Sequence, residues 1–317
     1  MKLRSVLLAP LALVAAAPLG GQELPPPGAE EQGAVVGVAT DRWERMTVPV
    51  SIDGSGPYPF VVDTGAERTV ISEELARDLQ LGPGQRVRLH SMSEVSRIET
   101  VKIMGLEIAG KTVREIHAPA LQRRNIGAEG ILGVDSLKSQ RVSFDFARQQ
   151  MTVTPSRRTE EKWHGDTIVI TARSRFGHLV LVDASLDGQK VWVILDTGAQ
   201  TTVGNSALRR RLEAKARLGQ TWPIEMLSVT GGRVKADQTV AKTMRLGDVD
   251  IRNMPIAFAD VHPFTKLDLM DRPAILLGMD ALRLFERVSV DFANRRVRLL
   301  APGHSERSRA TFAAMQY

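Results

Sequence analysis

The triplet Asp-Thr-Gly occurs twice in this chain, each time after an apolar run and before an alanine. The first copy is Phe60-Val61-Val62-Asp63-Thr64-Gly65-Ala66, and the second is Val193-Ile194-Leu195-Asp196-Thr197-Gly198-Ala199. Two equivalent carboxylates that face each other cannot both ionise cheaply, so they share one proton. The ionised member can take a proton from a water between them, while the protonated member donates to the carbonyl oxygen of an amide. Such a pair can hydrolyse a peptide bond.

The two triplets belong to a longer internal repeat. Ile131-Leu132-Gly133 follows the first triplet, and Leu276-Leu277-Gly278 follows the second. A strand-like segment with an aspartate comes next in each half, at Asp145 and at Asp291. The order is the same in both halves, and a period of this length indicates a duplicated domain rather than a solenoid. We interpret Asp145 and Asp291 as structural, and expect the repeated Asp135 and Asp280 to cap helices.

The 317 residues are enough for two domains with cores of their own. The start predicts a signal peptide over residues 1–21, since Lys2 and Arg4 precede a short apolar stretch from Val6 to Leu19, and Ala15-Ala16-Ala17 offers small residues for cleavage. That stretch is too short to span a bilayer, and an uncleaved membrane anchor is the alternative. We therefore expect an exported protein, periplasmic or secreted, with no stable membrane insertion once the signal is cleaved.

Composition and pattern predict the remaining boundaries. Pro, Gly and Glu are frequent at residues 22–40, which indicates a flexible lead-in. Lobe one is predicted at residues 41–155, a connector at 156–165, lobe two at 166–302 and a polar tail at 303–317. Alternating apolar residues at 46–52 and short apolar runs before each triplet predict strands. Ser72 and Asn205 are expected to cap short helices, and Asp187-Gly188 predicts a hairpin turn.

The composition excludes several classes of function. The chain has no cysteine, which excludes thiol catalysis and disulfides. The formal net charge is +6, but the basic residues are scattered and aromatic residues make up only 5%. A nucleic-acid partner is not expected, because it needs a concentrated basic stripe with aromatics. The six histidines show no metal-binding spacing, and no phosphate-binding glycine loop occurs. No metal and no cofactor are therefore expected.

The segment Asp63-Thr64-Gly65-Ala66-Glu67-Arg68-Thr69-Val70-Ile71 resembles the active-site loop of retropepsin-like aspartic proteases. The Leu-Gly dipeptides at residues 132–133 and 277–278 resemble the second signature of that family. Both signatures occur in both halves, so the resemblance covers roughly residues 46 to 300. It implies a mostly β fold, with duplicated retropepsin-like β-barrel lobes in a bilobal acid-protease fold and the active site between them. Viral relatives carry one lobe per chain and dimerise, whereas this chain resembles two such lobes in tandem, which implies a monomer.

The resemblance also implies roles for individual residues. Asp63 and Asp196 would be the catalytic dyad, supported by loop residues Thr64, Gly65, Ala66, Thr197, Gly198 and Ala199. The two threonines would hydrogen-bond across the interface, and the glycines would let the substrate approach the backbone. Leu132, Gly133, Leu277 and Gly278 would pack behind the loops.

A flap would follow each loop and close over a bound peptide. The candidate flap residues are Met92, Ser93, Thr230, Gly231 and Gly232. The first flap departs from the family pattern because it has no glycine at its tip. The peptide would lie extended between flaps and floor, adding backbone hydrogen bonds as an extra strand does.

These features predict an aspartic endopeptidase that acts through a water activated by Asp63 and Asp196. The alternative is an exported peptide-binding module that has the protease fold but no turnover. The intact Asp-Thr-Gly loops argue against it, because loss of activity would most readily appear as a changed residue in a triplet. An anchored structural protein with a duplicated β-barrel is a third interpretation, but it leaves the repeated loops unexplained.

Overall fold

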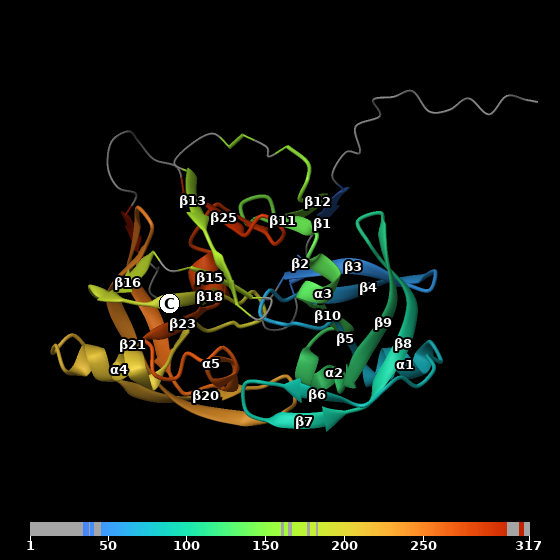
Figure 1. The fold of residues 1–317 in the computed structure, drawn as a ribbon, viewed down its shortest axis with the longest axis horizontal. Coiled ribbons are helices and arrows are strands. Elements are labelled where there is room, and N and C mark those ends of the chain that lie inside the picture. Colours follow the sequence, from blue (N-terminus) through green and yellow to red (C-terminus); the bar gives the residue numbers. More distant parts are fainter. Residues whose placement is uncertain are drawn as a thin grey trace, which may run out of the picture. The chain divides into compact units, whose positions relative to one another are not determined.

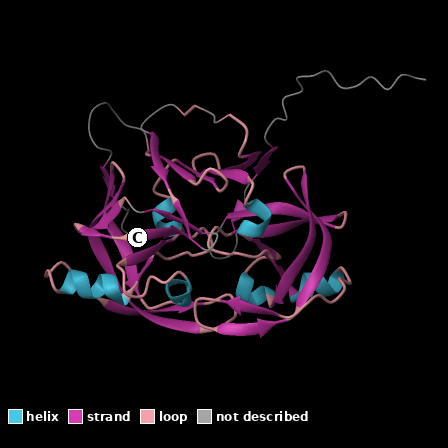
Figure 2. Ribbon diagram, in the orientation of Figure 1, coloured by secondary structure: helices cyan, strands magenta, loops and turns pink. Residues whose placement is uncertain are grey.

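Short apolar runs and alternating apolar residues form strands in this chain, which outnumber the few short helices (Figure 2). The computed structural model describes residues 34–37, 39–40, 46–159, 162–163, 167–175, 178–181, 183–302 and 311–313. These all fall within one unit of the chain, residues 33–317. The predicted signal peptide and most of the predicted tail lie outside the described residues. Among the described helices, none has the length and hydropathy needed to span a membrane.

The first lobe is a sheet with strand order β2-β3-β4-β10-β5-β9-β8, in which β3 also pairs with β8 (Figure 1). That extra pairing closes six of the strands into a ring. The sheet and its helices are β2 (Ala39–Thr40), β3 (Met46–Ile52), β4 (Ser55–Val62), β5 (Val70–Ser72), α1 (Glu73–Asp78), β8 (Thr100–Ile108), β9 (Lys111–Leu121), α2 (Arg123–Ile126), β10 (Gly130–Leu132) and α3 (Val134–Leu137). A separate hairpin consists of β6 (Val87–His90) and β7 (Val95–Ile98).

The second lobe repeats this path with the order β14-β15-β18-β23-β19-β22-β21-β16-β17. Its elements are β14 (Arg173–Arg175), β15 (His178–Leu181), β16 (Ala184–Leu186), β17 (Gln189–Lys190), β18 (Trp192–Leu195), β19 (Val203–Gly204), α4 (Ser206–Glu213), β20 (Trp222–Leu227), β21 (Arg233–Leu246), β22 (Val249–Phe258), α5 (His262–Lys266), β23 (Ala274–Leu277), α6 (Met279–Leu282) and β26 (Thr311–Ala313). The counterpart of β3 is divided, since β15 pairs with β18 and β16 pairs with β21. The stretch from Leu179 to Leu186, which its apolar residues favour as one strand, is therefore divided between two strands.

Several local predictions are confirmed. Ser72 caps α1, where its hydroxyl accepts a hydrogen bond from the Leu75 amide at 3.0 Å. Asn205 caps α4, where its side-chain oxygen accepts from the Leu208 amide at 2.9 Å. Asp187 and Gly188 both have positive φ, 46° and 73°, which is the geometry of the tight hairpin turn that the sequence predicts.

A third sheet joins the two halves. Its order is β1 (Ala34–Gly37), β12 (Gln150–Pro155), β11 (Gln140–Asp145), β24 (Arg287–Asp291), β25 (Arg296–Leu300) and β13 (Thr167–Thr171). We call it the central sheet. Its middle pair, β11 and β24, comes from opposite halves of the chain and runs antiparallel. The sequence places residues 34–37 in a flexible lead-in, whereas the structure pairs them as β1 with β12.

Charged pairs cross the middle of the central sheet in a two-fold pattern. Arg141 Nε donates to Asp291 Oδ2 at 3.1 Å, and the side chains are only 7% and 2% exposed. The counterpart pair, Arg287 with Asp145, has an N···O distance of 2.7 Å. Each aspartate of the repeat thus pairs with an arginine of the other half, which agrees with a structural role for both.

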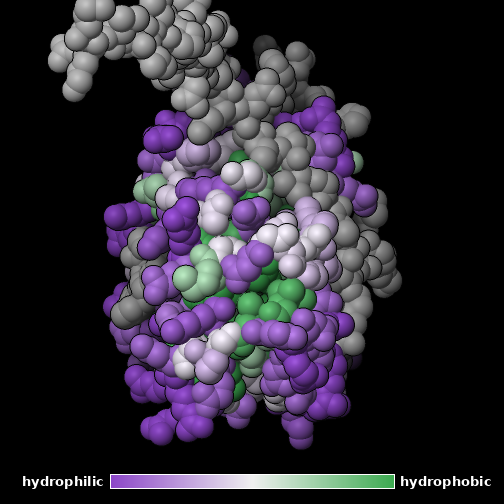
Figure 3. Space-filling view, turned by 90° about the vertical axis from the view of Figure 1, so that its right-hand side faces the viewer, coloured by the Kyte–Doolittle hydropathy of each residue, from purple (hydrophilic) through white to green (hydrophobic). Residues whose placement is uncertain are grey.

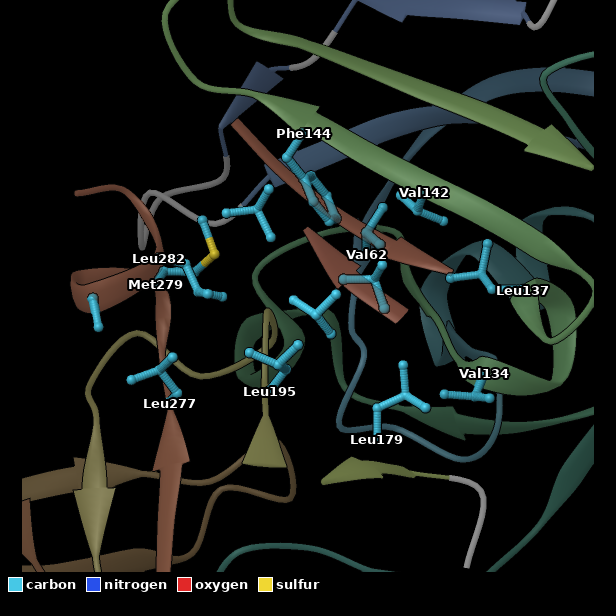
Figure 4. Close-up of a cluster of buried hydrophobic side chains, with 14 of the residues drawn as sticks. Val62, Val134, Leu137, Val142, Phe144, Leu179, Leu195, Leu277, Met279 and Leu282 are labelled. Carbon is cyan, nitrogen blue, oxygen red and sulfur yellow. The ribbon is translucent and has the colours of Figure 1, made fainter. Parts of the chain in front are cut away.

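A hydrophobic cluster fills the space between the central sheet and the two triplets (Figure 4). Val62 and Leu195, the residues just before the two aspartates, belong to this cluster and are at most 2% exposed. Phe144 from the central sheet packs in the same cluster and is 1% exposed. On the side of the molecule where β8 and β9 lie, a strip of hydrophobic residues shows through a mostly hydrophilic surface (Figure 3).

We predict that the buried pair in the central sheet contributes strongly to stability. Arg141→Met should lower the free energy of unfolding by about 3 kcal/mol or more, because it leaves the Asp291 carboxylate buried without its arginine. Urea denaturation of both proteins measures the difference. Arg86→Met is the control, because the ion pair that it removes is at the surface: Arg86 is 78% exposed and its partner Glu99 is 62% exposed. This variant should change the free energy of unfolding by less than about 1 kcal/mol. Equal losses in the two variants would contradict the prediction.

Candidate active site

The two Asp-Thr-Gly loops begin at the ends of equivalent strands. β4 runs parallel to β10 with Val62 opposite Leu132, and β18 runs parallel to β23 with Leu195 opposite Leu277. The ladder continues one residue further, where the amides of Asp63 and Asp196 donate to the carbonyls of Leu132 and Leu277, both at 3.0 Å. Each aspartate is therefore fixed by a strand pair of its own lobe.

Thr64 and Thr197 join the two loops through four buried hydrogen bonds. The amide of each threonine donates to the hydroxyl of the other, at 3.0 and 3.1 Å. Each hydroxyl donates in turn to a carbonyl of the opposite lobe, Thr64 to Leu195 at 2.9 Å and Thr197 to Val62 at 2.7 Å. We call this arrangement the threonine clasp. The cross-loop hydrogen bonds that the resemblance implies are thus present.

Backbone amides orient both carboxylates in the same way. Asp63 Oδ1 accepts from the amides of Gly65 and Ala66 at 2.7 and 2.9 Å. Asp196 Oδ1 accepts from Gly198 and Ala199, both at 3.0 Å. Burial, the negative charge of Asp63 and a hydrogen bond with Asp63 together raise the pKa of Asp196 far above its usual value of 3.8. The amides favour the ionised form, but they are outweighed.

Each glycine of a triplet lies against the aspartate of the other lobe. A Cβ atom on Gly65 would lie 2.6 Å from Cγ of Asp196, and one on Gly198 would lie 2.2 Å from Cγ of Asp63. Neither φ is in the left-handed region, so the reason for glycine here is space rather than backbone conformation. The two carboxylates can approach each other only because both positions lack a side chain.

The Leu-Gly dipeptides lie directly behind the loops. Leu132 and Leu277 are fully buried. A Cβ on Gly133 would lie 2.5 Å from the backbone of Arg68, and one on Gly278 would lie 2.8 Å from that of Thr201. The chain after each triplet therefore packs on a glycine of the second signature.

Asp135 and Asp280 have a different role from the predicted helix caps. The caps of α3 and α6 are Gly133 and Gly278, without a side-chain hydrogen bond. The Asp135 carboxylate accepts from the Thr69 amide at 2.9 Å and from its hydroxyl at 2.8 Å. Asp280 accepts from Thr202 in the same way, at 2.9 and 2.5 Å. Each carboxylate thus fixes the chain segment that follows the Asp-Thr-Gly loop of its lobe. Sequence spacing alone could not show that contact.

Asp63 and Asp196 line a cavity of about 440 Å³. Gly65, Ala66, Gly198 and Ala199 contribute to its floor, and Asp63 and Asp196 as whole residues are half-buried. Its roof includes residues of β6 and β20, the strands that lead to the predicted flap tips. The site residues from the two halves of the sequence thus meet in one cavity.

The flap tips meet each other above the cavity. The first tip is a four-residue turn in which the Ser91 amide donates to the Glu94 carbonyl at 2.9 Å, so it forms without glycine. Thr230 donates to Ser91 at 3.2 Å between the hydroxyls, and Gly231 uses a φ of 88°. Of the five predicted flap residues, Met92 lines the cavity, whereas Ser93, Thr230, Gly231 and Gly232 do not. The strand residues Leu89, Ile224 and Met226 do line it and were not predicted.

A charged cluster at the wall of the cavity was also not predicted. Glu67 follows the first loop, and its carboxylate lies 2.6 Å from Lys266 Nζ and 3.6 Å from His178 Nε2. The nearby His178 imidazole, followed by the Lys266 ammonium, lowers the pKa of Glu67 to about 2 although burial opposes the shift. The counterpart of Glu67 in the second loop is Gln200. Among the described residues, no group of three acidic, histidine or cysteine side chains could hold a metal.

Comparison with known families agrees with this geometry. Residues 48–139 match the model of the family described as “gag-polyprotein putative aspartyl protease”, and residues 182–281 match the model of the family described as “aspartyl protease”. No curated protein matches the chain in sequence. The chain contains two retropepsin-like aspartyl protease domains in tandem, on a mostly β fold.

We predict that the contact between each triplet glycine and the opposite aspartate is essential. Gly65→Ala and Gly198→Ala should each lower kcat/KM for peptide cleavage at least about a hundred-fold, because the new methyl group displaces a carboxylate. The matched control is Gly82→Ala, since no atom lies within 4 Å of a Cβ at that position. Peptidase assays on variants whose folding is verified by circular dichroism measure this. Activity close to that of the unmodified protein in either triplet variant would show that the carboxylates need not approach so closely.

Proposed function

We propose that this protein is an aspartic endopeptidase that hydrolyses peptide bonds through a water activated by Asp63 and Asp196. The observation that carries the proposal is the meeting of the Asp63 and Asp196 loops, which the threonine clasp holds together and in which the glycine of each loop lies against the aspartate of the other. The raised pKa of Asp196 beside Asp63 agrees with it. A carboxyl that keeps its proton next to one that does not is the acid–base pair that amide hydrolysis requires. The match of both halves to aspartyl protease families supports the same class.

The chemistry follows from the division of one proton between two carboxyls. The ionised carboxylate takes a proton from the water as its oxygen attacks the amide carbon, and the protonated carboxyl donates to the amide oxygen. Collapse of the tetrahedral intermediate reverses these roles and delivers a proton to the leaving nitrogen. Because the two groups titrate together, their pKa values belong to the pair.

The cavity fits an extended peptide. It is lined by residues of the flap strands and of both loops, and apolar side chains from both lobes contribute, among them Ile131, Ile194 and Leu276. A peptide in this position can add backbone hydrogen bonds to the flaps, as an added strand does. Such a substrate would be held on both sides of the scissile bond, which is the arrangement expected of an endopeptidase.

A binding module without turnover remains the competing function, and the carboxylate chemistry distinguishes the two. We further propose that one chain is the active unit, since a single chain contains both loops and the clasp between them. Export is proposed from the sequence pattern of residues 1–21, which lie outside the described residues.

Replacement of either dyad residue should abolish cleavage and leave the fold intact. Asp63→Asn and Asp196→Asn should each lower kcat at least about a thousand-fold, and the double variant should be little worse, because the two residues act as a unit. A diverse peptide library analysed by mass spectrometry shows whether the unmodified protein cleaves at all. If it binds peptides but cleaves none, it is the binding module instead. A single variant that keeps most of its kcat would contradict the shared-water mechanism.

The pH dependence follows from the proton that the pair shares. As pH rises through the raised pKa of Asp196, the dyad loses that proton and activity falls. As pH falls through the lower pKa of the pair, both carboxyls are protonated and activity is lost again. The side chains of Ala66 and Ala199 offer no hydroxyl donor to favour ionisation, so we expect a maximum at roughly pH 5 to 6.5. Ala66→Ser and Ala199→Ser should move the profile to lower pH, and a maximum near roughly pH 2 to 3 in the unmodified protein would contradict this account.

A further inference from the structure

The two halves place different charges at equivalent positions of the cavity. In the first loop Arg68 stands five residues after Asp63, and in the second loop Thr201 stands five residues after Asp196. On the flap strands Arg88 stands three residues before Ser91, and Glu225 stands three residues before Ser228. All four of these residues line the cavity. The duplication therefore kept the shape of the site while its charges became different in the two lobes.

Each flap strand lies over its own lobe, whereas the tips reach across, since Met92 packs in the cluster of the second lobe and Val229 in that of the first. Leu89, the neighbour of Arg88, packs in a cluster with Ala66 and Ile131 of the first lobe. Met226, the neighbour of Glu225, packs with Ile194 and Leu276 of the second lobe. Arg68 and Arg88 therefore belong to the half of the cavity that the first lobe builds, and Thr201 and Glu225 belong to the other half.

The two arginines are not neutralised by the protein. Both are exposed to the cavity, and within the described part of the chain no carboxylate forms an ion pair with either. The nearby acid, Glu67, is already held by Lys266 and His178. In the other half, Glu225 pairs with Arg233 at 2.5 Å. The first lobe thus places at the cavity two arginines without an ion pair to any described residue, whereas Lys266, the lysine of the second lobe that lines it, is paired with Glu67.

The pKa of the neighbouring His90 also reflects the positive charge in this part of the cavity. Burial, followed by the positive charges of Lys266, His262 and Arg88, lowers the pKa of His90. Arginine is the residue best suited to bind a carboxylate, because its planar guanidinium can donate two parallel hydrogen bonds.

We propose that the cleft binds peptides in one direction, with an Asp or Glu side chain held by Arg68 and Arg88 on one side of the scissile bond. This inference rests on the proposed peptidase function. A cleft with identical halves could accept a peptide in either direction, because its two sides would be equivalent. Here an acidic side chain on the second lobe would meet Thr201 and Glu225 instead, and Lys266 of that lobe is already paired with Glu67.

The test moves a single aspartate along a peptide that the protein cleaves, through positions on both sides of the scissile bond. At one or more positions on one side only, the aspartate should raise kcat/KM about three- to ten-fold, the range expected of partly exposed ion pairs. The double variant Arg68→Thr, Arg88→Glu gives the first lobe the residues of the second and should abolish this gain. Arg114→Gln, an exposed arginine of β9 outside the cavity, is the control and should leave it unchanged.

A reciprocal exchange makes the test sharper. Adding Thr201→Arg and Glu225→Arg to the double variant should restore the gain on the opposite side of the scissile bond. Equal gains on both sides in the unmodified protein, or a gain that survives the double variant, would overturn the inference while the peptidase function stands.

If no peptide is cleaved, the peptidase function fails, and dissociation constants for Asp and Lys versions of one peptide decide the charge preference. The unmodified protein must then bind the Asp version more tightly by about three- to ten-fold, and the double variant must not.

Discussion

The active site depends on the threonine clasp. Thr64 and Thr197 are buried, and each donates and accepts across the boundary between the lobes. Buried hydrogen bonds of this kind are costly to break singly, because a broken bond leaves a polar group unsatisfied. The clasp therefore fixes the distance between two loops that come from distant parts of the chain. The shared proton and the contacts between each glycine and the opposite aspartate both require that distance.

The central sheet and the hydrophobic cluster beside it support the clasp. The central sheet pairs β11 with β24 across the lobes, and the hydrophobic cluster above it includes the residues that precede both aspartates. Because a single chain contains both lobes, their association in the central sheet is intramolecular, and the association of the lobes does not depend on protein concentration.

Tandem fusion has a second consequence, since the two lobes can diverge in sequence. The charges at residues 68, 88, 201 and 225 show that they have done so around the cavity.

The sequence predicted the features that repeat and missed those that depend on contacts between distant residues. Asp63 and Asp196 could be identified because their surroundings occur twice, and the caps at Ser72 and Asn205 follow from local hydrogen-bonding chemistry. The central sheet could not be predicted, because strand periodicity does not show which strands pair. The contact of Asp135 with Thr69 was likewise hidden, since only the folded chain brings the second signature against the loop. The Glu67, His178 and Lys266 cluster has no repeat to signal it, because Gln200 replaces the glutamate in the second half.

The central claim is that both halves of the dyad come from the same chain. Complementation between inactive variants tests it most directly: Asp63→Asn protein and Asp196→Asn protein are unfolded, mixed and refolded together, and peptide cleavage is measured over a wide range of concentration. The intramolecular clasp predicts no more activity in the mixture than in either variant refolded alone. If the lobes instead paired between chains, one chain would supply Asp63 and another Asp196. Recovery of a substantial fraction of the activity of the unmodified protein in the mixture would then contradict the account.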